Sequence, residues 1–117
     1  MNSKLLFIIV LFAVSIFISG CASKNDIPSG KYDSFAKCLT EKNITMYGTS
    51  WCPHCKDQKE MFGDSVQYID FVDCDESKEV CLNLDIPGYP TWVINGEQYP
   101  GTQTFYDLAK LSGCSIN

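Results

Sequence analysis

Cys52 and Cys55 are the two residues whose types and spacing point most directly to chemistry. Only Pro53 and His54 separate them, so the two thiols can form and reopen a disulfide. An apolar segment precedes the pair and a helical pattern follows it, which places Cys52 at a helix N-terminus. The free N–H groups and partial positive charge there favour a thiolate, the reactive form of cysteine. The pattern predicts a redox-active dithiol.

The neighbouring residues indicate how the two thiols divide their roles. Cys52 lies nearer the helix start, so we expect it to be the more exposed thiol and to attack, with Cys55 resolving the mixed disulfide. Pro53 fits the first helical turn, where no N–H is missed. His54, the single histidine, either stabilises the thiolate or is a solvated turn residue. Trp51 either contacts substrate at the rim of the dithiol or packs into the fold.

Hydrophobic periodicity and turn residues predict an α/β domain around this pair. Helices are expected over residues 31–42, 52–62, 77–84 and 104–111. Strands are expected over residues 44–48, 66–72, 91–94 and 97–99, with an Asn-Gly hairpin turn at 95–96. Strands interleaved with helices require parallel pairing, and the hairpin adds an antiparallel edge. The expected fold is a mixed central sheet flanked by helices.

The N-terminal segment has the pattern of a targeting signal. Lys4 is followed by an uncharged apolar run over residues 5–18, then by two small residues and Cys21. As a helix this run reaches about 21 Å, short of the roughly 30 Å of hydrocarbon in a bilayer. Residues 1–20 are therefore predicted to be a signal peptide, and a transmembrane anchor is the weaker alternative.

Residues 18–21, Ile-Ser-Gly-Cys, resemble the lipobox of prokaryotic lipoproteins. In that family the cysteine is lipidated and becomes the new N-terminus, and two or more acyl chains give stable anchoring. The resemblance implies a lipid anchor on Cys21, on the outer face of the cell membrane or in the periplasm. Residues 21–31 would be the tether and residues 32–117 the folded domain. The alternative is an ordinary secretory peptide with an incidental cysteine.

Four further cysteines predict structural disulfides, because an even number in an exported chain indicates a disulfide framework. Three pairings are possible. We expect Cys74 to pair with Cys81, since one ends a strand and the other lies in the next helix. We expect Cys38, in the first helix, to pair with Cys114, after the last one. Both pairs are interpreted as staples, with a second redox relay as the alternative for Cys74 and Cys81.

A zinc site is the main rival interpretation of the cysteines. Four sulfurs would be available to a metal, from Cys52, Cys55, Cys74 and Cys81. Structural sites usually repeat the tight spacing twice, and the second pair is too widely spaced for that. We therefore expect no metal and no cofactor. The formal net charge is −5 and no basic patch is present, which argues against nucleic-acid binding. We expect a monomer.

Residues 47–56 resemble the active-site strand, turn and helix of thioredoxin-like oxidoreductases, and residues 88–91, Gly-Tyr-Pro-Thr, resemble the segment that carries their cis-proline. The resemblance implies a thioredoxin-like fold with Pro90 cis beside the dithiol. The backbone of Tyr89 would then be free to pair with an extended substrate. Spacing alone fits a trans proline that starts a strand equally well. Met46 departs from the family, where a buried acid often precedes the first cysteine by six residues; water or His54 would have to accept the proton of the second thiol.

A narrower resemblance, over residues 46–114, is to the thioredoxin-like domain fused to bacterial homologues of vitamin K epoxide reductase. The matching pieces are residues 51–55, 57–63, 88–92, 94–96 and 111–113. The multi-helix membrane domain of those proteins is not among the 117 residues. The resemblance therefore implies a separate membrane partner of that kind, which re-oxidises the dithiol and passes electrons to quinone.

These observations predict an exported thiol–disulfide oxidoreductase that oxidises the cysteines of other exported proteins. The Pro-His insert favours this direction, because it also occurs in DsbA, whose reduced form is stabilised. Two alternatives use the same residues. One is a reductase or isomerase in the same compartment, and the other is a non-catalytic binding module with an inert disulfide.

Overall fold

The computed structural model describes residues 27–117. The predicted signal peptide and Cys21 lie outside the described residues. The elements follow in the order α2 (Asp33–Glu41), β1 (Thr45–Gly48), α3 (Pro53–Phe62), the 3₁₀-helix η1 (Gly63–Tyr68), β2 (Asp70–Asp73), α4 (Lys78–Asn83), β3 (Thr91–Ile94), β4 (Glu97–Pro100) and α5 (Phe105–Ser112). Within residues 27–117, no helix has the length and apolar character needed to cross a bilayer.

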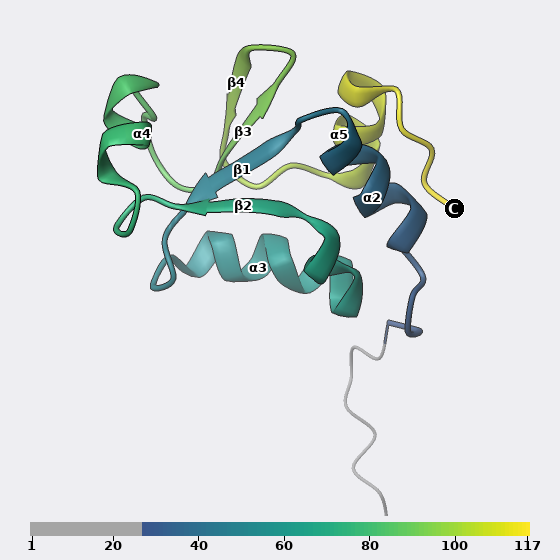
Figure 1. The fold of residues 1–117 in the computed structure, drawn as a ribbon. Helices are drawn as coiled ribbons and strands as arrows, with labels where there is room; N and C mark the ends of the chain where they lie inside the picture. The colour runs from purple at the N-terminus through teal and green to yellow at the C-terminus, as the bar shows by residue number, and fades with distance from the viewer. Residues whose placement is uncertain (1–26) are drawn as a thin grey trace, which may run out of the picture.

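A four-stranded mixed sheet forms the centre, in the order β2-β1-β3-β4 (Figure 1). β1 pairs in parallel with β2, from Thr45 opposite Asp70 to Gly48 opposite Asp73. β3 pairs antiparallel with β1 and with β4, which it joins through the predicted hairpin. In Figure 1, α3 runs beneath β1 and β2, and α4 lies at the opposite end of the molecule from α2 and α5. The predicted mixed sheet flanked by helices is confirmed.

Aromatic side chains join three helices to the sheet. Phe35 of α2, Phe62 of α3 and Trp92 of β3 are fully buried. The ring of Phe105, from α5, lies 4.6 Å from that of Phe62 and 5.3 Å from that of Phe35 between centroids. Buried aromatic pairs stabilise a fold through area and through ring geometry. This cluster fixes α3, and with it the start of that helix, against the sheet.

The strand predicted over residues 66–72 is wrong in its first half. Residues 63–68 form η1, and β2 spans only Asp70–Asp73. The buried Ser65 explains the difference, because its hydroxyl donates to Asp33 at 2.8 Å and accepts from the N–H of Tyr32 at 3.2 Å. These bonds hold the segment to the start of α2, and Val66 and Ile69, three residues apart, both pack on the core. The other elements end within two residues of their predicted bounds.

Two disulfides lie in the described part of the chain, Cys38–Cys114 and Cys74–Cys81. They are the pairs expected from the sequence. The first joins α2 to the residue after the C-cap of α5. The second closes the connection from β2 into α4.

Residues 28–31, which the sequence analysis assigns to the tether, form a turn against η1. The N–H of Lys31 donates to the carbonyl of Pro28 at 3.1 Å. The hydroxyl of Ser29 and the N–H of Gly30 both donate to the Asp64 carboxylate, at 2.5 and 3.0 Å. These bonds hold the pKa of Asp64 below its usual value. The ordered fold therefore reaches back to these residues.

Candidate active site

Cys52 is the N-cap of α3, immediately after the turn that follows β1. Its backbone is extended, and its Sγ accepts the N–H of Cys55 at 3.1 Å. Serine, threonine and aspartate usually take this position, because a side-chain acceptor satisfies an N–H that has no partner within the helix. Pro53 follows at the first helical position, as predicted. A donor aimed at the sulfur, together with the helix dipole, is the geometry that favours a thiolate.

Cys55 lies on the inner face of α3 and packs against β1. A Cβ atom added to Gly48 would lie 2.6 Å from the Cys55 Sγ, so a glycine is required for the sulfur to approach the strand this closely. Burial raises the pKa of the Cys55 thiol to about 11, and its hydrogen bond with Cys52 adds to the rise. A backbone hydrogen bond from Thr49 and the charge of Lys59 act in the opposite direction.

The dithiol is asymmetric in its surroundings more than in its exposure. Cys52 is 5 % exposed and Cys55 1 %, and both are free of disulfide bonds. The order of exposure is the expected one, but both cysteines are buried. The difference therefore lies in hydrogen bonding: the first sulfur accepts a helix N–H, and the second is a protonated thiol at neutral pH behind it.

Trp51 lies at the surface beside the dithiol. Its side chain is 66 % exposed, and its indole N–H donates to Asp75 Oδ2 at 2.6 Å. Its ring stands perpendicular to that of Tyr89, with centroids 6.2 Å apart. The Tyr89–Pro90 peptide bond is cis, and Pro90 is buried. Trp51 is therefore placed at the rim of the dithiol and is not packed into the fold.

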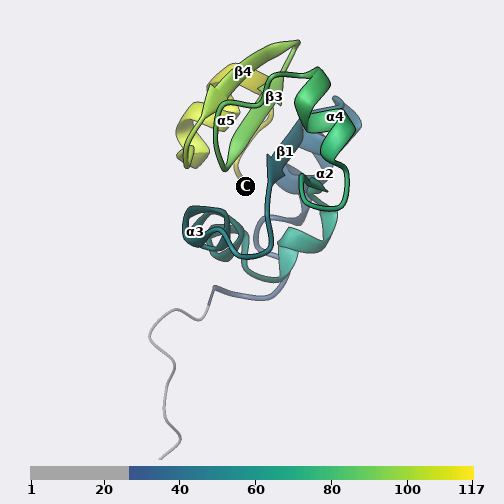
Figure 2. The ribbon, with the colours of Figure 1, turned by 90° about the vertical axis from the view of Figure 1, so that its left-hand side faces the viewer.

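Asp75 is a site residue that the sequence analysis missed. It follows Cys74 in the turn after β2, far from Trp51 in sequence. Parallel pairing sets Gly48 opposite Asp73, so the turns that leave β1 and β2 emerge side by side. Figure 2 looks onto this end of the molecule and shows β1 between α3 and α4. The strand register that joins these turns is not encoded in any short motif.

His54 does not turn inward in this structure. Its side chain is largely exposed, and Nδ1 lies 3.9 Å from Asp57 Oδ2, one turn further along α3. The Thr102 hydroxyl donates to its carbonyl at 3.4 Å. Any influence of the imidazole on Cys52 would therefore act at the outer surface, and it would be weakened by solvent screening.

Gln58 is a buried polar anchor beneath the dithiol, also missed from the sequence. Its Oε1 accepts from the Trp92 indole at 3.0 Å and from the Gln103 N–H at 2.7 Å. Its Nε2 donates to the Gln103 carbonyl at 3.1 Å. The signal was its spacing, because Cys55, Gln58 and Phe62 share one face of α3. A fully bonded buried amide fixes α3 to β3 and to the segment before α5.

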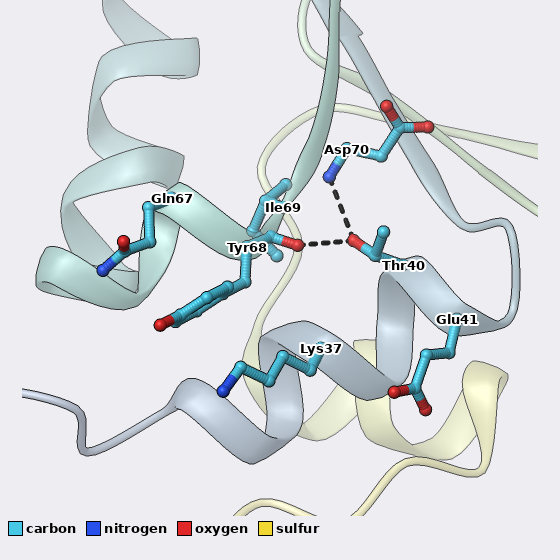
Figure 3. A pocket seen from close by; sticks show the side chains of 7 residues that line it. All are labelled: Lys37, Thr40, Glu41, Gln67, Tyr68, Ile69 and Asp70. Carbon is cyan, nitrogen blue, oxygen red and sulfur yellow. Dashed lines mark hydrogen bonds between the residues drawn. The ribbon is translucent and has the colours of Figure 1, made fainter.

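A surface pocket of about 400 Å³ lies elsewhere (Figure 3). Its lining residues are Lys37, Thr40, Glu41, Gln67, Tyr68, Ile69 and Asp70. The Thr40 hydroxyl donates to the Tyr68 carbonyl and accepts from the Asp70 N–H, at 2.5 and 3.1 Å. Asp70 pairs with Thr45 at the start of β1, whereas the dithiol follows the end of that strand. The pocket and the dithiol therefore lie toward opposite ends of these strands.

The zinc interpretation loses two of its four ligands in this structure. Cys74 and Cys81 are bonded to each other and have no thiolate to offer a metal. Among residues 27–117, no group of three or more histidine, cysteine or acidic side chains is placed to hold a metal ion.

Comparison with known proteins decides the family. The thioredoxin family model matches residues 29–111. The chain belongs to the thioredoxin family. Thiol-disulfide oxidoreductase LTO1 of Arabidopsis thaliana is 36 % identical over 93 residues, which cover 72 % of this chain and 25 % of that protein. Protein disulfide isomerase-like 2-2 of Oryza sativa subsp. japonica is 40 % identical over 116 residues, covering 86 % and 30 %.

This chain thus spans less than a third of the length of either relative. The solution structure of the first thioredoxin domain of mouse protein disulfide-isomerase A4 aligns with a TM-score of 0.43 and 19 % identity, over 80 % of this chain and 84 % of that one. The family match confirms the predicted thioredoxin-like domain.

Proposed function

We propose that this protein oxidises pairs of cysteine thiols in exported proteins through a Cys52–Cys55 disulfide. The observation that carries the proposal is the N-cap geometry of Cys52, whose sulfur accepts the Cys55 N–H. A hydrogen-bonded thiolate stabilises the reduced form of the dithiol, and a stabilised reduced form makes the disulfide a stronger oxidant.

The reaction takes two exchange steps. A substrate thiolate attacks Cys52 of the protein disulfide, the bond to Cys55 breaks, and Cys55 leaves with the electron pair and takes up a proton. A second substrate thiolate then attacks the first substrate sulfur, and Cys52 leaves as a thiolate. Two electrons have passed from the substrate to the protein, and the substrate has gained a disulfide.

Trp51 and Tyr89 are the proposed substrate contacts. Their rings are exposed and perpendicular to each other, and Tyr89 directly precedes the buried Pro90. Aromatic rings supply contact area for varied side chains, and an extended substrate backbone can pair with the main chain at Tyr89. Such a surface suits proteins that share a cysteine and little else in sequence.

The proposed setting is the outer face of a membrane. Lipidated Cys21 would hold the domain there, and a membrane partner resembling vitamin K epoxide reductase would re-oxidise the dithiol by disulfide exchange. The lipobox resemblance of residues 18–21 supports the anchor. The resemblance of residues 46–114 to the domain fused to vitamin K epoxide reductase homologues supports the partner. Labelling with a fatty-acid probe should depend on Cys21, and unchanged labelling of Cys21→Ala would refute the anchor.

A reduction potential tests the direction of transfer. We expect a value well above the roughly −270 mV of thioredoxin and nearer the roughly −120 mV of DsbA. A value at or below that of thioredoxin would indicate a reductase. In addition, Cys55→Ala should accumulate mixed disulfides through Cys52, and failure to trap any would refute the assigned order.

The name of the rice relative keeps isomerisation as a second candidate. The redox state of the dithiol in cells separates the two functions, because an oxidase is kept mostly oxidised and an isomerase or reductase mostly reduced. A pair that resists both oxidant and reductant would instead identify a binding module.

A further inference from the structure

Lys59 is a half-buried cation one helical turn beyond Cys55. Its Nζ lies 3.4 Å from the centre of the Phe71 ring on β2. An ammonium over an aromatic face is attracted by the ring quadrupole, and the contact strengthens as water is excluded. The ammonium is therefore held against the sheet and does not extend into solvent.

Phe71 also lies where Cys55 meets the sheet. A Cβ atom on Gly48 would come within 3.2 Å of the Phe71 ring and 2.6 Å of the Cys55 sulfur. Ring and sulfur thus share the space above the same glycine, and Lys59 covers the ring. Helix spacing of four residues puts Lys59 and Cys55 on the same side of α3.

Met46, which takes the position of the buried acid in the thioredoxin-like oxidoreductases, lies next to Phe71. Met46 is buried and is the register partner of Phe71 in the β1–β2 ladder. Gly48 and Phe71 lie beside the Cys55 sulfur and Thr49 hydrogen-bonds to it, and none of these three residues is charged. The positive charge of Lys59 lowers the pKa of the Cys55 thiol, although by less than burial and the neighbouring Cys52 raise it.

We propose that Lys59, held on the ring of Phe71, is a positioning residue that stabilises the thiolate of Cys55. This inference rests on the proposed dithiol exchange, in which Cys55 must leave as an anion. When a substrate thiolate attacks Cys52, the electron pair of the broken disulfide bond passes to Cys55 before a proton arrives. A fixed cation lowers the cost of that charge. A buried acid would instead accept the proton of the Cys55 thiol. The cation therefore acts when Cys55 leaves as an anion, and an acid acts when Cys55 is deprotonated.

Titration of Cys55 in a Cys52→Ser background tests the inference directly. The Cβ resonance of isotope-labelled Cys55 reports its ionisation without any need for solvent access. Lys59→Met keeps a side chain over Phe71 but removes the charge. Compared below about pH 10, where an ordinary lysine is still mostly charged, it should lower the thiolate-to-thiol ratio by about three- to ten-fold. Lys59→Arg should restore it.

Lys56 offers a matched control on the same helix. Its Nζ is exposed and lies 3.7 Å from Glu60 Oε1, so Lys56→Met should leave the titration unchanged. An unaltered Cys55 titration in Lys59→Met, or an equal shift in Lys56→Met, would overturn the inference. The titration uses no protein substrate, so failure of the proposed oxidase activity would be recognised separately.

Discussion

Two cysteine pairs lie at the same end of this molecule and differ in state. One follows β1 and the other follows β2, and the two strands end side by side, with Gly48 opposite Asp73. Cys52 and Cys55 are free, within one turn of a helix that begins between them. Cys74 and Cys81 are joined to each other across a turn and part of a short helix. Position relative to a helix start, and not the presence of two nearby cysteines, distinguishes the free pair, which we propose to be the reactive one.

The largest effect should separate the two pairs by activity. Cys52→Ser removes the sulfur that the helix N–H supports, and should reduce oxidation of a reduced protein substrate by ~10³-fold or more. The double variant Cys74→Ser with Cys81→Ser should stay within about three-fold of the parent. Oxidative refolding of a reduced test protein measures both. An equal loss in the double variant would make the second pair a relay and remove the distinction.

Stability should separate the staples from one another. Closing the loop of 76 residues between Cys38 and Cys114 removes about 4.5 kcal/mol of entropy from the unfolded chain, against about 2.5 kcal/mol for the short loop between Cys74 and Cys81. Replacing Cys38 and Cys114 by alanine should therefore lower the free energy of unfolding more than replacing Cys74 and Cys81. Urea denaturation with the dithiol reduced gives both values, and a larger loss from the short loop would contradict the loop-closure explanation.

A smaller effect should come from the hydrogen bond between Trp51 and Asp75, which lie next in sequence to Cys52 and Cys74. Asp75 lies inside the loop of the second pair and holds Trp51 at the rim of the first. Asp75→Asn weakens a charge-assisted bond, so KM for a cysteine-containing peptide should rise about three-fold with kcat nearly unchanged. Trp51 fluorescence should shift in parallel. An unchanged KM alongside shifted fluorescence would show that the orientation of Trp51 is irrelevant to binding.

The smallest effect concerns the turn at residues 28–31. Hydrogen bonds from Ser29 and Gly30 lower the pKa of Asp64 in the folded state. Because the folded pKa is the lower one, this stabilisation is present above the unfolded pKa, about 3.9, and is lost as pH falls through the folded value. Asp64→Asn should therefore slightly lower the melting temperature at pH 7 and not in strong acid. A difference that persists in acid would rule out ionisation as its cause.

The sequence predicted most of what depends on neighbours along the chain. The start of α3 at Pro53, the Asn-Gly hairpin and the Cys74–Cys81 pair followed from local patterns. The pairing of Cys38 with Cys114, 76 residues apart, was predicted from their positions in the first helix and after the last one. It missed what depends on strand register, namely the contact of Asp75 with Trp51 and that of Lys59 with Phe71. The strand predicted over residues 66–72 failed because apolar residues spaced by three fit a 3₁₀-helix as well as a mixed strand pattern.

The proposed dithiol exchange depends on Gly48, because even a Gly48→Ala substitution would disturb it. A methyl group in place of one hydrogen would occupy the seat of the Cys55 sulfur and crowd the Phe71 ring as well. The residue carries no reactive atom, and its replacement would leave every thiol in the sequence. A related protein without this glycine would still carry both cysteines of the motif, but the sulfur at the position of Cys55 would be displaced.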